Sequence, residues 1–126
     1  MLISEAHYQN GPYIQAVDLI RGFKLQDQWL AASLLLLPQE YQVLPTVPTL
    51  SDLPWETIFK TLTEQEVELL LIGIGHTPML PPHPLLIRWR CSEHNIEWMQ
   101  SGAACRTHAV VSQERRTALL LWWDTL

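Results

Sequence analysis

The chain has 126 residues, of which 48% are hydrophobic and 17% are charged. That length and apolar content predict one globular domain over residues 1–126 and exclude intrinsic disorder. Eight Lys and Arg residues against thirteen Asp and Glu residues give a net charge of −5, whereas nucleic acids and anionic membranes are bound by basic surfaces. We therefore expect no nucleic acid partner.

Membrane and export signals are absent from the pattern of the chain. No apolar run approaches the roughly 20 residues of a membrane-spanning helix. Residues 1–5 contain no basic region followed by an apolar run, so we expect no signal peptide and a cytoplasmic protein without direct membrane insertion. The two cysteines, Cys91 and Cys105, are too few for a disulfide framework, and we expect both to be reduced.

The first half of the chain reads mainly as strands. Residues 13–20 alternate imperfectly, as a half-buried strand does. Residues 29–37 predict a longer strand whose last part, Leu34–Leu37, is apolar on both faces, which suits a central strand covered on both sides. Four prolines in residues 38–54 then indicate extended loop and edge strand, followed by a short helix that starts near Pro54.

The second half alternates helices with strands. Thr63 and Glu66 fit a capping box, which predicts a helical turn that leads into a buried strand at Leu69–Ile74. Ser101 is a natural N-cap for a later helix. The remaining expected elements are a helix over 85–94, a strand over 96–99, a helix over 102–113 and a strand over 116–123. This order is that of an α/β sheet.

Gly73 and Gly75 lie between a predicted strand and the next helix, where a phosphate-binding turn can lie. However, the third glycine of the dinucleotide fingerprint is missing, and His76-Thr77-Pro78 replaces a clean helix start. We therefore favour the interpretation that these glycines let the chain leave a crowded sheet edge, and we expect no nucleotide site.

The segment Ser101–Thr107 is the most chemically suggestive. Small residues at a helix start leave backbone N–H groups accessible, and the helix dipole favours an anion there. In a binding role Arg106 would hold a carboxylate or phosphate, and Cys105 beside it would have a lowered pKa. The structural alternative is that the small residues allow close packing on the sheet and that Arg106 pairs with an acid such as Glu114.

A repeated Cys-x-x-His spacing raises the question of a metal. Cys91 with His94 and Cys105 with His108 supply four ligand types that tetrahedral zinc accepts. Neither pair lies in a short glycine-rich knuckle, and a chain of this length folds without metal. We therefore favour a protein with no metal and no cofactor.

The two tryptophans near the end of the chain are the last candidate for a binding surface. Trp122 and Trp123 are adjacent, so on a strand they face opposite sides. An exposed tryptophan would anchor a protein contact, although core packing is the commoner explanation. A homodimer through this end or through an apolar strand edge is a further option.

Three stretches together resemble one known family: residues 33–38, residues 69–75, and residues 103–107 continuing to Glu114. Their order and separations are similar to the small domain-of-unknown-function family that includes the adipogenesis-associated Mth-domain protein and mitochondrial complex I assembly factor 3. The resemblance covers about residues 10–122. It implies a compact three-layer α/β domain in which two β layers stack with one helical layer around a mixed sheet.

The resemblance also implies a site. The residues Gly73, Gly75, Cys105, Arg106 and Thr107 match the family pattern, as does Glu114, and imply a shared surface pocket near the helix start. Departures from the pattern are Ile74 for a threonine, His108-Ala109 for an aromatic-Asn pair, and Arg115 for a glycine. The loss of the threonine and the asparagine counts against a catalytic site. Because His108 is not the residue of the family pattern, we also expect no family-wide zinc site.

The family has no established catalytic activity, and its mitochondrial member acts in building respiratory complex I by binding partner proteins at the membrane. We therefore expect a non-enzymatic domain that binds another protein, connected to the assembly of a membrane-associated respiratory complex. The alternative is a domain that binds a small anion or metabolite at Ser101–Thr107, with latent enzymatic chemistry at Cys105.

Overall fold

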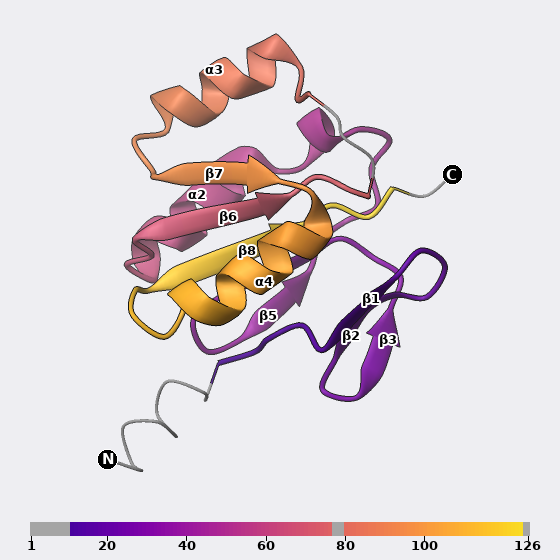
Figure 1. Ribbon diagram of the computed structural model, residues 1–126. Helices are drawn as coiled ribbons and strands as arrows, with labels where there is room; N and C mark the ends of the chain where they lie inside the picture. The colour runs from indigo at the N-terminus through magenta and orange to yellow at the C-terminus, as the bar shows by residue number, and fades with distance from the viewer. Residues whose placement is uncertain (1–10, 77–79, 125–126) are drawn as a thin grey trace.

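The strands of the computed structural model, which describes residues 11–76 and 80–124, form two sheets (Figure 1). Residues 1–5, where no signal peptide is expected, and Thr77-Pro78 of the predicted turn lie outside these residues. The small sheet is an antiparallel meander. It consists of β1 (Ala16–Asp18), β2 (Gly22–Leu25) and β3 (Gln28–Leu30).

The large sheet has the order β5-β4-β8-β6-β7. Strand β6 pairs in parallel with β7 and β8, whereas β4 pairs antiparallel with β5 and β8, so the sheet is mixed as expected. Its strands are β4 (Leu34–Leu36), β5 (Tyr41–Val43), β6 (Leu69–Gly73), β7 (Ile96–Met99) and β8 (Thr117–Leu121).

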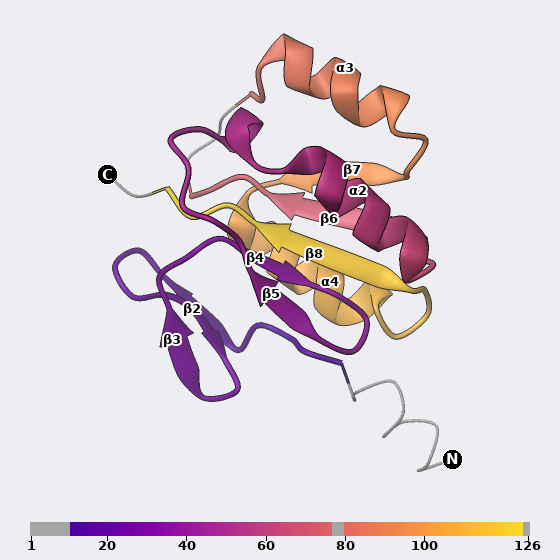
Figure 2. The ribbon, with the colours of Figure 1, turned by 180° about the vertical axis from the view of Figure 1, so that it is seen from behind.

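Helices and the small sheet cover the two faces of the large sheet, which gives three layers. The helical elements are η1 (Leu50–Asp52), α2 (Trp55–Glu64), α3 (His83–Cys91) and α4 (Ser101–Val111). Helices α2 and α3 lie on one face, while α4 lies beside the small sheet on the other face (Figures 1 and 2). The expected mixed α/β fold with two sheets is confirmed.

The three inner strands of the large sheet, β4, β8 and β6, are buried along their whole length. Alternate side chains serve two separate cores, because successive residues of a strand point to opposite faces. Leu70, Ile72 and Leu120 pack with the side of α2 and α3, whereas Leu69 and Leu119 pack with the side of α4 and the small sheet. The prediction of a central strand at Leu34–Leu37 is confirmed, since β4 lies between β5 and β8.

The predicted strand over 29–37 is wrong as a single element. Its first part belongs to β3 in the small sheet and its second part is β4 in the large sheet. Leu30 of β3 packs in the same core as Leu34 and Leu36 of β4, so hydrophobicity did not mark the break.

The capping box at Thr63 and Glu66 is also wrong. Thr63 lies in the last turn of α2, where its hydroxyl donates to the carbonyl of Phe59 at 3.1 Å. Glu66 follows the helix with a φ of 54°, a left-handed conformation that ends it. Side-chain capping is found instead at η1, where the Asp52 carboxylate accepts from both the N–H and the hydroxyl of Thr49.

The helix boundaries are displaced from the expected ones. Helix α3 starts at His83 and ends at Cys91, with Pro84 in its first turn, where a missing N–H is harmless. Helix α4 starts at Ser101 itself, and its N-cap is Gln100. Within residues 11–76 and 80–124, none of the helices combines the length and apolar character that crossing a bilayer requires.

Candidate functional site

The predicted site begins where β6 ends against the start of α4. The N–H of Ser101 donates to the carbonyl of Gly75 at 2.9 Å. The N–H of Gly75 donates in turn to the Ser101 hydroxyl oxygen at 3.0 Å. Ser101 is fully buried, so both polar groups of this junction are used inside the protein.

The two glycines serve this junction in different ways. A Cβ on Gly73 would lie 2.8 Å from the Leu121 side chain and 2.9 Å from the Ser101 Cα, so only glycine lets α4 approach the sheet this closely. Gly75 has open space around it but a φ of 116°, which L-residues rarely adopt. Packing and turn geometry account for both glycines without a bound phosphate.

The environment of Cys105 is apolar. Its side chain packs against the core between the two sheets, and burial raises the pKa of the thiol to about 12, with a smaller lowering effect from Arg106. The expectation of a lowered pKa is therefore wrong, because desolvation of the thiolate outweighs the neighbouring positive charge.

Arg106 and Thr107 lie in two further environments. Arg106 is exposed and, among residues 11–76 and 80–124, forms no ion pair, so the expected pairing with Glu114 is not present. Thr107 is half-buried, and its hydroxyl donates to the Met99 sulfur at 3.6 Å. The side chains of Cys105, Arg106 and Thr107 thus do not converge on one point.

The two Cys-x-x-His pairs lie on opposite sides of the large sheet. Cys91 and His94 are at the end of α3, where the His94 ring stacks on Phe59 with centroids 5.5 Å apart. Cys105 and His108 are on α4. In the described part of the chain no three metal-ligating side chains gather, so a zinc site built from both pairs does not form.

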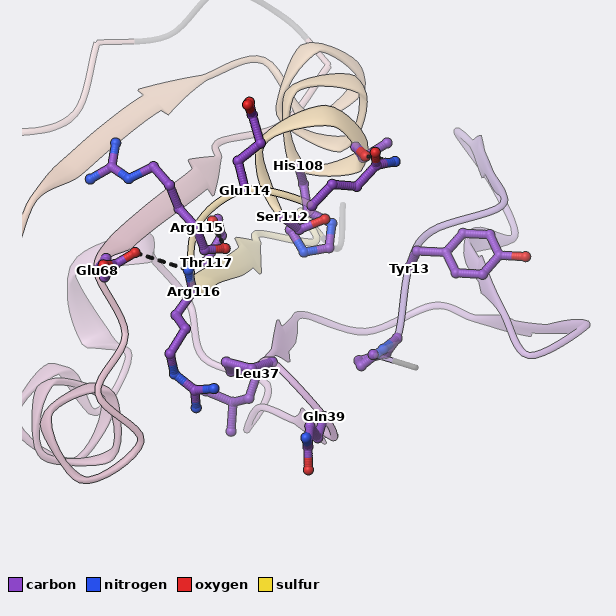
Figure 3. A pocket seen from close by; sticks show the side chains of 15 residues that line it. Tyr13, Leu37, Gln39, Glu68, His108, Ser112, Glu114, Arg115, Arg116 and Thr117 are labelled. Atoms are coloured by element: carbon purple, nitrogen blue, oxygen red, sulfur yellow. Dashed lines mark hydrogen bonds between the residues drawn. The ribbon is translucent and has the colours of Figure 1, made fainter. Parts of the chain in front are cut away.

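A cleft of about 690 Å³ lies at the other end of α4 (Figure 3). Its walls come from the end of α4 with the following turn, from the β4–β5 turn and from the segment before β1. None of residues 101–107 lines it. The side chains labelled in Figure 3 include Tyr13, Leu37, Gln39, His108, Ser112, Arg116 and Thr117.

Two polar residues of this cleft are buried, His108 and Thr117, and the Thr117 hydroxyl donates to the carbonyl of Arg115 at 3.0 Å. His108 is 3% exposed, and its ring forms no hydrogen bond to the described residues. Burial lowers its pKa to about 4, so the ring is neutral at pH 7. Figure 3 shows the ring on the side of α4 that faces Leu37 and Gln39. In the sequence, His108 stands out only as part of a Cys-x-x-His pair and as a departure from the family pattern. Neither feature predicts the cleft.

The charged residues of the cleft are mostly engaged. Arg116 donates from Nε and Nη2 to the carbonyl of Gln65 at 3.1 and 2.7 Å. Its backbone N–H donates to Glu68 Oε1 at 3.1 Å. Glu114 and Arg115 are exposed at the rim and carry opposite charges. The walls of the cleft therefore have no excess charge of either sign.

The tryptophans at the end of the chain are not an exposed anchor. Trp122 is buried in the core beneath α2 and α3. Trp123 is half-buried on the opposite side, where it packs edge-on against Phe23 with centroids 5.7 Å apart. Their opposite orientation agrees with the expectation, and core packing accounts for both.

Exposed aliphatic side chains occur instead at the tip of the β1–β2 hairpin. Leu19 is 70% and Ile20 is 84% exposed. The Asp18 carboxylate accepts hydrogen bonds from the N–H groups of Ile20 at 2.8 Å and Arg21 at 2.9 Å. These backbone hydrogen bonds, from Arg21 first and Ile20 second, lower the pKa of Asp18. Arg21 also lies over the Trp29 ring, 4.3 Å from its centroid.

Comparison with known proteins identifies the family. A family model described as a protein of unknown function (DUF498/DUF598) matches residues 20–122. The chain therefore belongs to this family. A comparison with curated proteins found no significant match.

Solved structures share the fold. A protein from Xanthomonas campestris is 27% identical over 95% of this chain and 90% of that chain, with a TM-score of 0.73. A protein from Bartonella henselae described as an outer membrane protein is 28% identical over 89% of this chain and 94% of that chain, with a TM-score of 0.69. A Bordetella pertussis protein described as a Mth938-like domain is 17% identical over 90% of this chain and 86% of that chain, with a TM-score of 0.66. The resemblance to the Mth-domain family is confirmed.

Proposed function

We propose that this domain is a non-enzymatic protein-binding domain that docks through the tip of the β1–β2 hairpin. The supporting observation is the exposure of Leu19 and Ile20 on an ordered turn. Adjacent large apolar side chains that project into water mark a candidate site of protein contact.

The turn favours binding because its shape is set before a partner arrives. Asp18 pairs with Gly22 across the hairpin, and the Asp18 carboxylate holds the N–H groups of Ile20 and Arg21. Little conformational freedom is then lost on docking. Burying each aliphatic side chain in an apolar groove of the partner contributes roughly 1.5–3 kcal/mol.

A binding role also agrees with the chemistry of the interior. Catalysis by Cys105 would need a thiolate, but burial raises the pKa of this thiol to about 12. The alternative of anion binding at Ser101–Thr107 gains no support from the junction, because the Ser101 N–H already donates to Gly75. That alternative stays a prediction.

The proposed partner is a subunit of a membrane-associated respiratory complex. This part of the proposal is supported by the resemblance to the mitochondrial assembly factor. An apolar groove on such a subunit would receive Leu19 and Ile20, and the domain would hold the subunit during assembly.

Quantitative capture from extracts of the source cells tests the proposal. The baits are the full chain, the double variant Leu19→Ser/Ile20→Ser, and Val110→Ser as a matched control, because Val110 is an aliphatic residue of α4 that is 65% exposed. We expect a respiratory-complex subunit to be recovered with the full chain and the control, and at least tenfold less with the double variant, a loss of about 1.4 kcal/mol or more.

Two results would contradict the proposal. Equal recovery with all three baits would place the contact away from the hairpin. The second result is native mass spectrometry that finds this chain bound only to copies of itself. It would show that the domain self-associates and does not bind a subunit of another complex.

A further inference from the structure

We propose that the cleft at the end of α4 is a binding site for an uncharged small organic molecule that carries an amide or hydroxyl group. It is formed by α4 and its following turn, the β4–β5 turn and the segment before β1. This site is separate from protein docking at the β1–β2 hairpin, since none of the residues at the hairpin tip lines it.

The size of the cleft fits a small molecule. Its volume is about 690 Å³. Ligand pockets in proteins span roughly 300–1,000 Å³. Three segments far apart in the sequence form its walls, so a ligand would be enclosed from several sides. Pro12 and Pro38, which are half-buried, supply apolar surface to the cleft.

His108 supplies an unpaired polar group inside this cleft. A neutral imidazole carries one donor and one acceptor nitrogen. The His108 ring forms no hydrogen bond to the described residues, and its nitrogens are not fully enclosed, because the one fully enclosed side-chain nitrogen or oxygen without a partner among these residues is Trp89 Nε1. Because the ring lies at the cleft and faces Leu37 and Gln39 (Figure 3), a bound molecule can supply the missing partner.

Ser112 places a second polar group beside the first. Residues His108 and Ser112 are four positions apart at the end of α4, a spacing that puts both side chains on one side of the helix. The Ser112 hydroxyl also forms no hydrogen bond to residues 11–76 and 80–124. An amide or hydroxyl group of a ligand can therefore bond to the imidazole and the hydroxyl together.

The charges of the cleft favour an uncharged ligand. Arg116 already donates to the carbonyl of Gln65, and Glu68 accepts from the Arg116 N–H. The rim residues Glu114 and Arg115 are exposed and of opposite sign. The two acids and two arginines of the lining balance each other, so the cleft as a whole attracts neither an anion nor a cation.

Titration with three matched probes tests the proposal. Benzamide is the uncharged probe, and benzoate and benzylamine are its anionic and cationic counterparts at pH 7. Two-dimensional ¹H–¹⁵N NMR spectra of the full chain follow the binding. We expect benzamide to shift the resonances of residues 108–117 in a saturable way, and to bind at least tenfold more tightly than either charged probe.

Two substitutions on α4 locate the site. Ala109→Trp fills the cleft from an exposed lining position, and Val110→Trp is the control at the next exposed position, which does not line it. We expect only Ala109→Trp to abolish benzamide binding. Binding that survives Ala109→Trp, no shift with any probe, or equal affinity for benzoate would each overturn the proposal.

Discussion

Ser101 and Gly75 hold each other through two hydrogen bonds. The N–H of each residue donates to an oxygen of the other, to the carbonyl of Gly75 at 2.9 Å and to the hydroxyl of Ser101 at 3.0 Å. This pair joins the end of a central parallel strand to the start of α4. It explains why the segment with the strongest sequence signal for anion binding is a structural junction.

Replacing Ser101 with alanine tests the junction. We expect Ser101→Ala to leave the Gly75 N–H unsatisfied in the interior and to lower the free energy of unfolding by about 1–3 kcal/mol. Ser51→Ala is the control, because the Ser51 hydroxyl forms no hydrogen bond within residues 11–76 and 80–124. Urea denaturation measures the free energy of unfolding of both variants. Equal values would show that the hydrogen bond between Ser101 and Gly75 does not stabilise the fold.

Adding a methyl group to each glycine separates packing from backbone strain. At Gly73 the new Cβ would meet the Ser101 Cα at 2.9 Å, so α4 must shift, and we expect a loss of about 1–3 kcal/mol. At Gly75 the loss comes from the φ of 116°, and we expect about 1–3 kcal/mol without movement of α4. Chemical shifts of α4 residues distinguish the two variants, and unchanged α4 shifts in Gly73→Ala would contradict the steric explanation.

The two thiols differ in reactivity. Cys91 is exposed, whereas burial raises the pKa of Cys105 to about 12. We expect Ellman's reagent at pH 8 to modify Cys91 rapidly and Cys105 only after denaturation, because the thiolate is the reacting form. Cys91→Ser should leave only the slow reaction. A fast reaction in that variant would show that Cys105 is open to solvent.

His108 makes stability depend on pH. Burial lowers its pKa from 6.5 to about 4, so the unfolded chain takes up a proton at a higher pH than the folded chain. The free energy of unfolding should therefore fall as the pH drops from 6.5 to 4, by roughly 3 kcal/mol from this residue. His108→Gln should remove this part of the loss, while His83→Gln, at an exposed position, should keep it. Identical pH profiles in the two variants would exclude His108 as the source.

Local sequence patterns identified the central strands well and the boundaries poorly. Leu34–Leu36 and Thr117–Leu121 are apolar at nearly every position, as strands covered on both faces must be. The pair Thr63 and Glu66 was misinterpreted because the same residue types that cap a helix start also occur in a last turn. Here the tertiary packing of Trp55, Ile58 and Leu62 placed the helix upstream of the motif.

By itself, the sequence determined the mixed α/β class, the central strands and the family, because these depend on local apolar patterns and on motif order. Only the tertiary structure decided the surroundings of α4. Small and apolar residues lie around most of this helix, so its pattern does not mark the face that meets the sheet. The structure buries His108 to 3% exposure and leaves Val110 65% exposed. The cleft could not be foreseen for the same reason, since its walls come from segments near residues 12, 38 and 112 that only folding brings together.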